Sequence, residues 1–283
     1  MKNIACVILN YNDYRTTINL VKRIKDYKIF DKILIVDNKS TNDSFKKIKE
    51  KFLNENKIVV ISSPKNGGYG YGNNFGVNYA YAHFKSKYVV ISNPDVSFTN
   101  DAVKKLIDVA ENTNAAIVSG VQNINRIAIK DKAWKIPSAF ESVFLNTKFS
   151  EFFKKDIYYP EKYFNSELSE VECVPGAMFL LDVNKFLKVG GYDEDFFLYY
   201  EETCLGIKLK RKSFKTFLVN DVKYDHLHSV SIDQSIPQIS KQYLLLNKSK
   251  DILMKKYLGA GKLTRTFSNV LFKINLKIIK HKK

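Results

Sequence analysis

The chain has 283 residues, and its content of 45% hydrophobic, 27% charged and 13% aromatic residues is that of a globular protein. This composition excludes a collagen-like chain and a wholly disordered one. The formal net charge of +17 is unevenly distributed, because Lys241–Lys283 contains twelve lysine and arginine residues and one acid, Asp251. A local basic bias of this kind suits a polyanion, either nucleic acid or an anionic lipid surface.

The sequence indicates a cytoplasmic protein. No apolar run approaches the roughly 20 residues of a membrane-spanning helix. Lys2 followed by Ile4–Leu9 is too short a pattern for a signal peptide. Cys6, Cys173 and Cys204 are odd in number and far apart, so they predict neither a disulfide framework nor a metal site, which fits a reducing cytosol.

The first half of the chain alternates strands with helices. Short apolar runs rich in β-branched residues predict strands at Ile4–Leu9, Ile33–Val36, Ile58–Ile61, Tyr88–Ser92 and Ala116–Ser119. Helical spacing of apolar residues predicts helices between them, at Thr16–Tyr27, Phe45–Asn56, Phe75–Phe84 and Ala102–Glu111. This alternation predicts a Rossmann-like α/β fold, with a mostly parallel central sheet flanked by helices on both faces.

The second half is less regular. Residues 122–170 show no firm period, and we interpret them as an irregular insertion near the functional site. Beyond them the pattern predicts two strands and two helices, at Val171–Leu181, Glu201–Lys212, Phe214–Val219 and Ile236–Tyr257. The predicted organisation is one α/β domain over residues 1–235, with a basic helical C-terminal extension over residues 236–283.

Polar segments follow the predicted strands. They are Asn10-Tyr11-Asn12, Asp37-Asn38, Pro64–Gly72 and Asn93-Pro94-Asp95. Because ligands of such sheets bind beyond the carboxyl ends of the strands, the topology predicts a site where these segments converge.

Three of these segments allow more than one interpretation. Asp37 and Asn38 could form hydrogen bonds with the imide edge of a uracil or thymine, or they could cap a helix. The glycines of Asn66–Gly72 could cradle a phosphate or form a flexible loop, and their spacing differs from the dinucleotide-binding G-x-G-x-x-G pattern. Asp95 suits a divalent cation that bridges two phosphates, although an acid here could also cap a helix.

Two further groups could carry chemistry. Glu201 and Glu202 follow an aromatic run, where partial desolvation would raise the carboxyl pKa and favour a proton acceptor. Only one of the two neighbours can face a site from a helix. His226 and His228 follow a predicted strand and are candidate metal ligands, although a lone histidine is more often structural.

The order of these segments resembles the family 2 glycosyltransferases, in particular the rhamnosyltransferase-like group of bacterial cell-surface polysaccharide biosynthesis. The segments that carry the resemblance are Val7–Asn12, Ile35–Asp43, Asn66–Asn74, Asn93–Asp95, Pro175–Met178, Gly190–Glu202 and His226 with Ser231. Each segment alone is weak evidence for the family, and the resemblance depends on the occurrence of all of them in the same order.

The resemblance implies a GT-A fold and an inverting transfer from a UDP- or dTDP-linked sugar to a hydroxyl of a saccharide or lipid-linked acceptor. It implies nucleotide binding by Asn10, Asn12, Asp37, Asn38, Asn66, Gly68, Asn73 and Asn93. It implies a Mn²⁺ or Mg²⁺ site at Asp95 and His226. The pocket for the sugar and the acceptor would contain Gly176, Ala177, Met178 and Glu201.

The resemblance also implies the catalytic base. The family pattern is Glu-Asp with the second acid as base, and Glu202 occupies that position here, one methylene longer. Cys204 stands where the family often has a further aspartate. We therefore expect Glu202, rather than Glu201, to take the proton from the acceptor hydroxyl.

Two other functions compete with sugar transfer. The glycine-rich segment would fit a nucleotide-binding oxidoreductase of the Rossmann type, and the charge of +17 would fit a basic nucleic-acid-binding protein. Neither explains the ordered motifs, so we expect a nucleotide-sugar and an acceptor as partners and no nucleic acid.

The tail predicts an amphipathic helix. Its apolar stripe is Phe267, Val270, Leu271, Ile274 and Ile278, and its lysines on another side are Lys273, Lys277 and Lys280. We interpret it as a peripheral contact with the anionic inner face of the plasma membrane, where a lipid-linked acceptor would lie. The alternatives are packing on the domain and packing on a second copy in a homodimer.

Overall fold

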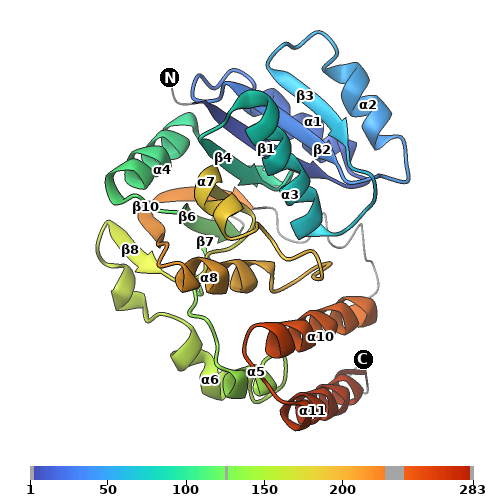
Figure 1. The fold of residues 1–283 in the computed structure, drawn as a ribbon, viewed down its shortest axis with the longest axis vertical. Coiled ribbons are helices and arrows are strands. Elements are labelled where there is room, and N and C mark those ends of the chain that lie inside the picture. The colour runs from blue at the N-terminus through green and yellow to red at the C-terminus, as the bar shows by residue number, and fades with distance from the viewer. Residues whose placement is uncertain (1–2, 125–126, 227–238, 281–283) are drawn as a thin grey trace.

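The structure is a computed structural model that describes residues 3–124, 127–226 and 239–280. Its strands are β1 (Ile4–Asn10), β2 (Lys32–Asp37), β3 (Ile58–Ser62), β4 (Tyr88–Ser92), β5 (Val96–Ser97), β6 (Ile117–Ile124), β7 (Ile127–Ala128), β8 (Leu168–Val171), β9 (Met178–Asp182) and β10 (Thr216–His226). They form one sheet with the order β3-β2-β1-β4-β9-β6-β10-β5, in which β7 pairs with β6 and β8 with β10 (Figure 1).

Helices connect and cover these strands. They are α1 (Tyr14–Ile24), α2 (Ser44–Lys51), α3 (Tyr69–Tyr79), the π-helical η1 (Ala80–Phe84), α4 (Asn100–Thr113), α5 (Ala139–Phe144), α6 (Ser150–Ile157), the short 3₁₀ helix η2 (Glu161–Phe164), α7 (Val183–Lys188), α8 (Glu201–Arg211), α10 (Ile239–Lys256) and α11 (Lys262–Lys280).

The N-terminal part of the sheet is parallel. β3, β2, β1 and β4 run in one direction, β9 runs antiparallel between β4 and β6, and β10 is parallel to β6. This arrangement confirms the predicted α/β fold with a mostly parallel sheet. The carboxyl ends of β1, β2 and β4 consequently open at one edge, where the polar segments follow.

The hydrophobic core has one layer on each face of the sheet. Cys6 and Ile8 of β1 pack with residues of α1, α2 and α4, whereas Val7 packs with residues of α3, α7 and α8. Strands that are buried on both faces are apolar throughout rather than alternating. This explains why the strands of the first half were recognisable as short continuous apolar runs.

Several predicted boundaries were wrong. The strand expected at Phe214–Val219 continues to His226 as β10, so His226 ends this strand instead of following it. The helix expected at Phe75–Phe84 begins at Tyr69, within the segment interpreted as a loop. The strand expected over Val171–Leu181 is two strands, β8 and β9, that pair with different neighbours. Residues 122–170 are not simply irregular, because they contain α5, α6 and β8, and a capping box between Ser138 and Glu141 begins α5.

The C-terminal helices pack on the rest of the chain. Figure 1 shows α10 and α11 at the end of the molecule opposite β3, close to α5. Leu253 of α10 is buried with Phe196 and Cys204, and the Ser249 hydroxyl of α10 donates to the Leu198 carbonyl at 2.6 Å. None of the described helices is both long and apolar enough to cross a bilayer.

Candidate functional site

A cavity of about 690 Å³ opens at the carboxyl ends of the strands. Polar residues from the strand ends line one part of it: Asp13, Asn38, Asn66, Asn93, Gln122 and His226. Apolar and aromatic residues from the insertion, from the segment before α8 and from α10 line the other part: Trp134, Leu145, Ile157, Tyr158, Tyr199, Tyr200 and Leu246. Most of the aromatic lining therefore comes from the insertion and the segment before α8, whereas the strand ends contribute mainly amide and other polar side chains.

Most of the predicted site residues meet at this cavity. Those that line it are Asn38, Asn66, Gly68, Asn93, Gly176, Ala177, Glu201, Glu202 and His226. Asp95 follows Pro94, which lines the cavity. Five other predicted residues do not line it: Asn10, Asn12, Asp37, Asn73 and Met178. The roles that the resemblance assigns to all of these residues stay predictions.

Asp37 and Asn10 form a buried polar network behind the strand ends. The Asp37 carboxylate accepts hydrogen bonds from Asn10 Nδ2 at 2.8 Å and from Ser40 Oγ at 2.6 Å. Ser40 Oγ also accepts from the backbone N–H of Asn12 at 2.8 Å. These bonds hold the ends of β1 and β2 in register, and the neighbouring Asn38 is the member that reaches the cavity.

The glycine-rich segment contacts the aromatic run before α8. Gly68 has a φ of 91°, and a Cβ built on it would lie 2.0 Å from the carbonyl oxygen of Phe197. That carbonyl accepts a hydrogen bond from the backbone N–H of Tyr69 at 3.1 Å. Asn38 Nδ2 donates to the Gly68 carbonyl at 3.0 Å. Gly68 is thus required by its backbone conformation and by a close backbone contact.

Replacing Gly68 by alanine is expected to destabilise the fold. The positive φ and the contact with the Phe197 carbonyl together should lower the free energy of unfolding by about 1–3 kcal/mol or more, as measured by urea denaturation. Gly259→Ala is the matched control, because Gly259 has a φ of 65° but no atom within 4 Å of a built Cβ. Equal losses in the two variants would contradict the close contact.

Asp95 and His226 lie together beside the cavity. β5 pairs antiparallel with the end of β10, and this pairing sets His226 opposite Val96, the residue after Asp95. His226 Nε2 lies 3.2 Å from Asp95 Oδ1, and Asp95 is 3% exposed. His228 and Ser231 lie outside the described residues.

This pair fits a divalent cation in part. A carboxylate oxygen is a suitable ligand for Mn²⁺ or Mg²⁺, which also accept phosphate oxygens and water, and an imidazole nitrogen beside it suits Mn²⁺ better than the harder Mg²⁺. Within the described residues, no group of three or more His, Cys, Asp and Glu side chains is placed to hold a metal ion. A cation here would therefore need oxygens of a bound ligand to complete its coordination.

Glu201 and Glu202 begin α8, and both line the cavity, so the expectation that only one of them would face the site was wrong. Glu201 is 2% exposed, and burial followed by the charge of Glu202 raises its pKa well above 4.5. Burial also raises the pKa of Glu202, while backbone hydrogen bonds of Glu202 itself and of Gly176 act in the opposite direction. Since Glu202 is the less buried of the two, we expect Glu202 to ionise before Glu201.

Unusual backbone geometry precedes the two acids. Tyr199 and Tyr200 have φ values of 75° and 68°, which side-chain-bearing residues rarely adopt. Tyr200 Oη accepts a hydrogen bond from Asn146 Nδ2 at 2.7 Å, which ties the start of α8 to the insertion. Strained backbone of this kind is concentrated at functional sites.

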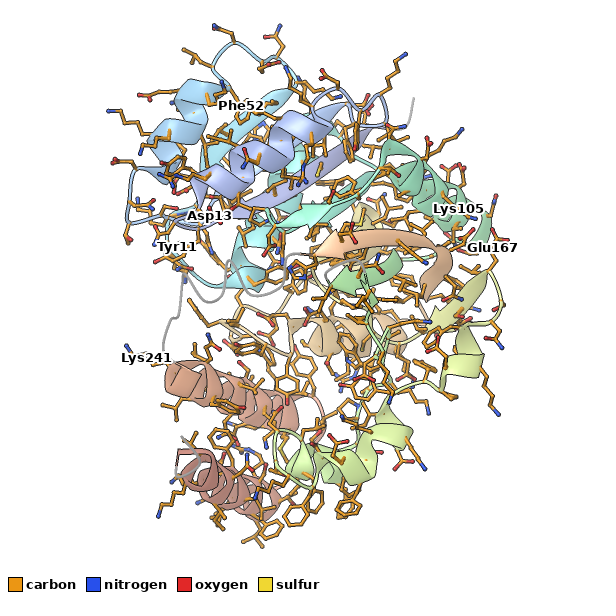
Figure 2. All side chains as sticks on the ribbon, turned by 180° about the vertical axis from the view of Figure 1, so that it is seen from behind. Tyr11, Asp13, Phe52, Lys105, Glu167 and Lys241 are labelled. Atoms are coloured by element: carbon orange, nitrogen blue, oxygen red, sulfur yellow. The ribbon has the colours of Figure 1, made fainter. Side chains whose placement is uncertain are left out.

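The apolar part of the cavity was not foreseen. Trp134 Nε1 donates to Thr203 Oγ1 at 3.1 Å, and its backbone pairs with Cys173 and Tyr158. Trp134 is the single tryptophan of the chain, but nothing in its surrounding sequence indicated these partners. Tyr11 also lines the cavity, and Figure 2 shows it close to Asp13 after β1.

The sequence model of the family described as glycosyl transferase family 2 matches residues 5–188. The chain belongs to this family. It is 25% identical over 246 residues to the low-salt glycan biosynthesis hexosyltransferase Agl10 of Haloferax volcanii, a match that covers 87% of this chain and 73% of that protein. The predicted class of enzyme, a glycosyltransferase, is thereby confirmed.

Solved structures show the same fold. The crystal structure of GalNAc-T7 with UDP, GalNAc and Mn²⁺ matches with a TM-score of 0.64 and 12% identity, over 99% of this chain and 57% of that chain. The structure of S. aureus TarS matches with a TM-score of 0.57 and 13% identity, over 98% of this chain and 43% of that one. This family 2 chain thus has the predicted GT-A fold and spans about half the length of those two chains.

Proposed function

We propose that this chain is a metal-dependent, inverting hexosyltransferase of cell-surface glycan biosynthesis. Its donor would be a UDP- or dTDP-linked sugar, and its acceptor a hydroxyl of a saccharide or of a lipid-linked saccharide. The observation that carries the proposal is that one cavity contains Glu202 and adjoins the Asp95–His226 pair. The name of the Agl10 relative supports a hexose as the transferred group.

The donor fits the polar part of the cavity. Asn38, Asn66 and Asn93 line it at the strand ends, and Gly68 adds a lining residue without a side chain. A nucleotide across these strand ends would direct its diphosphate toward the Asp95–His226 pair. Mn²⁺ or Mg²⁺ held by that pair would supply Lewis-acid stabilisation of the charge on the departing diphosphate.

The acceptor fits the part of the cavity that contains Glu202. The Glu202 carboxylate would take the proton of the acceptor hydroxyl while that oxygen attacks the anomeric carbon. The bond from the anomeric carbon to the diphosphate breaks in the same displacement, so the configuration inverts. Trp134 and Tyr158 provide aromatic surface in the same part, which suits the apolar face of a sugar ring.

Replacing Asp95 by asparagine tests the donor site. We expect Mn²⁺ to tighten the binding of UDP or dTDP to the wild-type chain, and the variant to weaken that metal-dependent binding by about tenfold or more. Isothermal titration calorimetry with and without MnCl₂ measures both effects. Asp101→Asn, an exposed acid at the start of α4, is the matched control. The proposal is contradicted if neither nucleotide binds, or if Asp95→Asn retains the full effect of Mn²⁺.

A further inference from the structure

Helix α11 has a buried face of mixed polarity, which packs on the described part of the chain, and an exposed apolar face, which does not. The buried face contains Ser268, Phe272 and Asn275, which pack toward α5. The second face is exposed and consists of Leu263, Phe267, Val270 and Ile274. Their spacing of four, three and four residues places them in one row, and Leu263 is 88% exposed.

A second group of exposed aromatic side chains lies on α5, which packs against α11, and on α6, which packs against α5. Phe140 is on α5, Phe149 directly precedes α6, and Phe152 on α6 is 77% exposed. Figure 1 shows α5, α6 and α11 at the same end of the molecule, away from β3. Exposed large apolar side chains that gather in this way mark an interaction surface.

The charge of α11 indicates what this surface meets. Lys262–Lys280 contains no acidic residue, and Lys262, Lys273 and Lys277 are exposed. At 100° per residue these three lysines lie along one edge of the exposed apolar row. Asp251, the one acid of the basic tail, is paired with Arg265 at 2.6 Å. The exposed face is therefore apolar with a cationic border.

We propose that the exposed face of α11, defined by Leu263, Phe267, Val270 and Ile274, docks on the surface of an anionic lipid bilayer. Apolar side chains insert at the boundary between headgroups and acyl chains, and lysines beside them attract anionic headgroups. A second copy of the chain is a poorer partner, because α11 packed on α11 would bring these lysines together without an acid on either helix.

Two hydrogen bonds connect α11 to residues that line the cavity. Asn275 Nδ2 of α11 donates to the Asn146 carbonyl at 3.1 Å, and Asn146 Nδ2 donates to Tyr200 Oη at 2.7 Å. Asn146 and Tyr200 both line the cavity. Docking of α11 would hold the acceptor part of the cavity beside a bilayer that contains a lipid-linked acceptor. This consequence rests on the proposed function. The docking itself does not depend on that function.

Flotation of the full chain with vesicles tests the docking. We expect it to float with equimolar phosphatidylglycerol and phosphatidylcholine vesicles and not with phosphatidylcholine alone. The double variant F267S/I274S should reduce the bound fraction about tenfold or more, because it removes two large apolar side chains from the contact. K273Q/K277Q should lower binding in a salt-dependent manner.

The matched control is Leu53→Ser, which alters an exposed leucine just after α2, remote from α11. It should float as the wild type does. Light scattering without lipid provides the second readout. The proposal is overturned if F267S/I274S floats as well as the wild type. It is also overturned if the wild type does not float but forms a dimer that this variant converts to a monomer. Since no donor or acceptor is present, failure here is separate from failure of the proposed transfer.

Discussion

Replacing Glu202 by glutamine is expected to lower kcat about 10²–10⁴-fold, the usual contribution of a general base. Glutamine keeps the size of the side chain but cannot take a proton, so donor binding should stay close to wild type. Glu201→Gln is the matched comparison and should lose far less, because glutamine reproduces the neutral form that burial favours at Glu201. Steady-state kinetics, together with calorimetric titration of the nucleotide, separate the two effects.

The wild type and Glu202→Gln should also differ in the pH dependence of their activity. Burial raises the pKa of Glu202, and only its ionised form accepts a proton. The wild-type kcat/KM should therefore fall as the pH decreases through a value above 4.5, and the residual activity of Glu202→Gln should lack this acidic limb. Glu202 is not the base if the variant is as active as the wild type, or if its acidic limb is unchanged.

Replacing Gly176 by alanine is expected to lower kcat by about 10²-fold, the effect of displacing a reacting group by roughly 1 Å. A Cβ on Gly176 would lie 2.3 Å from Glu202 Oε1, so the carboxylate has to move. The atom displaced is the end of a flexible side chain, and the melting temperature and the donor affinity should consequently change little.

A double variant separates this displacement from other effects of the added methyl group. If Gly176→Ala acts through Glu202, it should cause no further loss in the Glu202→Gln background. A full additional loss in that background, or wild-type activity of Gly176→Ala alone, would contradict the account.

The predicted sheet and its polar edge depend on local pattern. Buried parallel strands are short apolar runs. The residues that follow them meet at one edge of the sheet, independently of the exact bounds of the helices between the strands. Asn38, Asn66 and Asn93 were therefore predictable members of the site. His226 is different, because only the short β5–β10 pairing brings it to Asp95, and the order of motifs, rather than any local pattern, indicated this.

The start of α3 was not predictable from local preference. Glycine disfavours helices, yet Gly72 and Gly76 lie within α3 because a Cβ would come within 2.3 Å of Leu9 and 2.5 Å of Val7 on β1. Close packing of the helix on the strand outweighs the intrinsic preference, and no single-sequence pattern contains that information.

The insertion and the tail were harder to predict for a related reason. Trp134 reaches Thr203, and Asn275 reaches Asn146, through contacts between segments far apart in the chain. In α11 the buried face includes the polar Ser268 and Asn275, so hydrophobic periodicity alone did not show which face packs on the domain. The predicted stripe proved to be mainly the exposed face.

A nucleotide diphosphate and a cation in the cavity between Asp95 and Glu202 would be visible in crystals soaked with UDP and MnCl₂ and measured at a wavelength with manganese anomalous signal. We expect an anomalous peak within coordination distance of Asp95 and His226, with the diphosphate bound to that ion and its terminal phosphate facing Glu202. A manganese peak away from this pair, or UDP bound outside the cavity, would contradict this expectation.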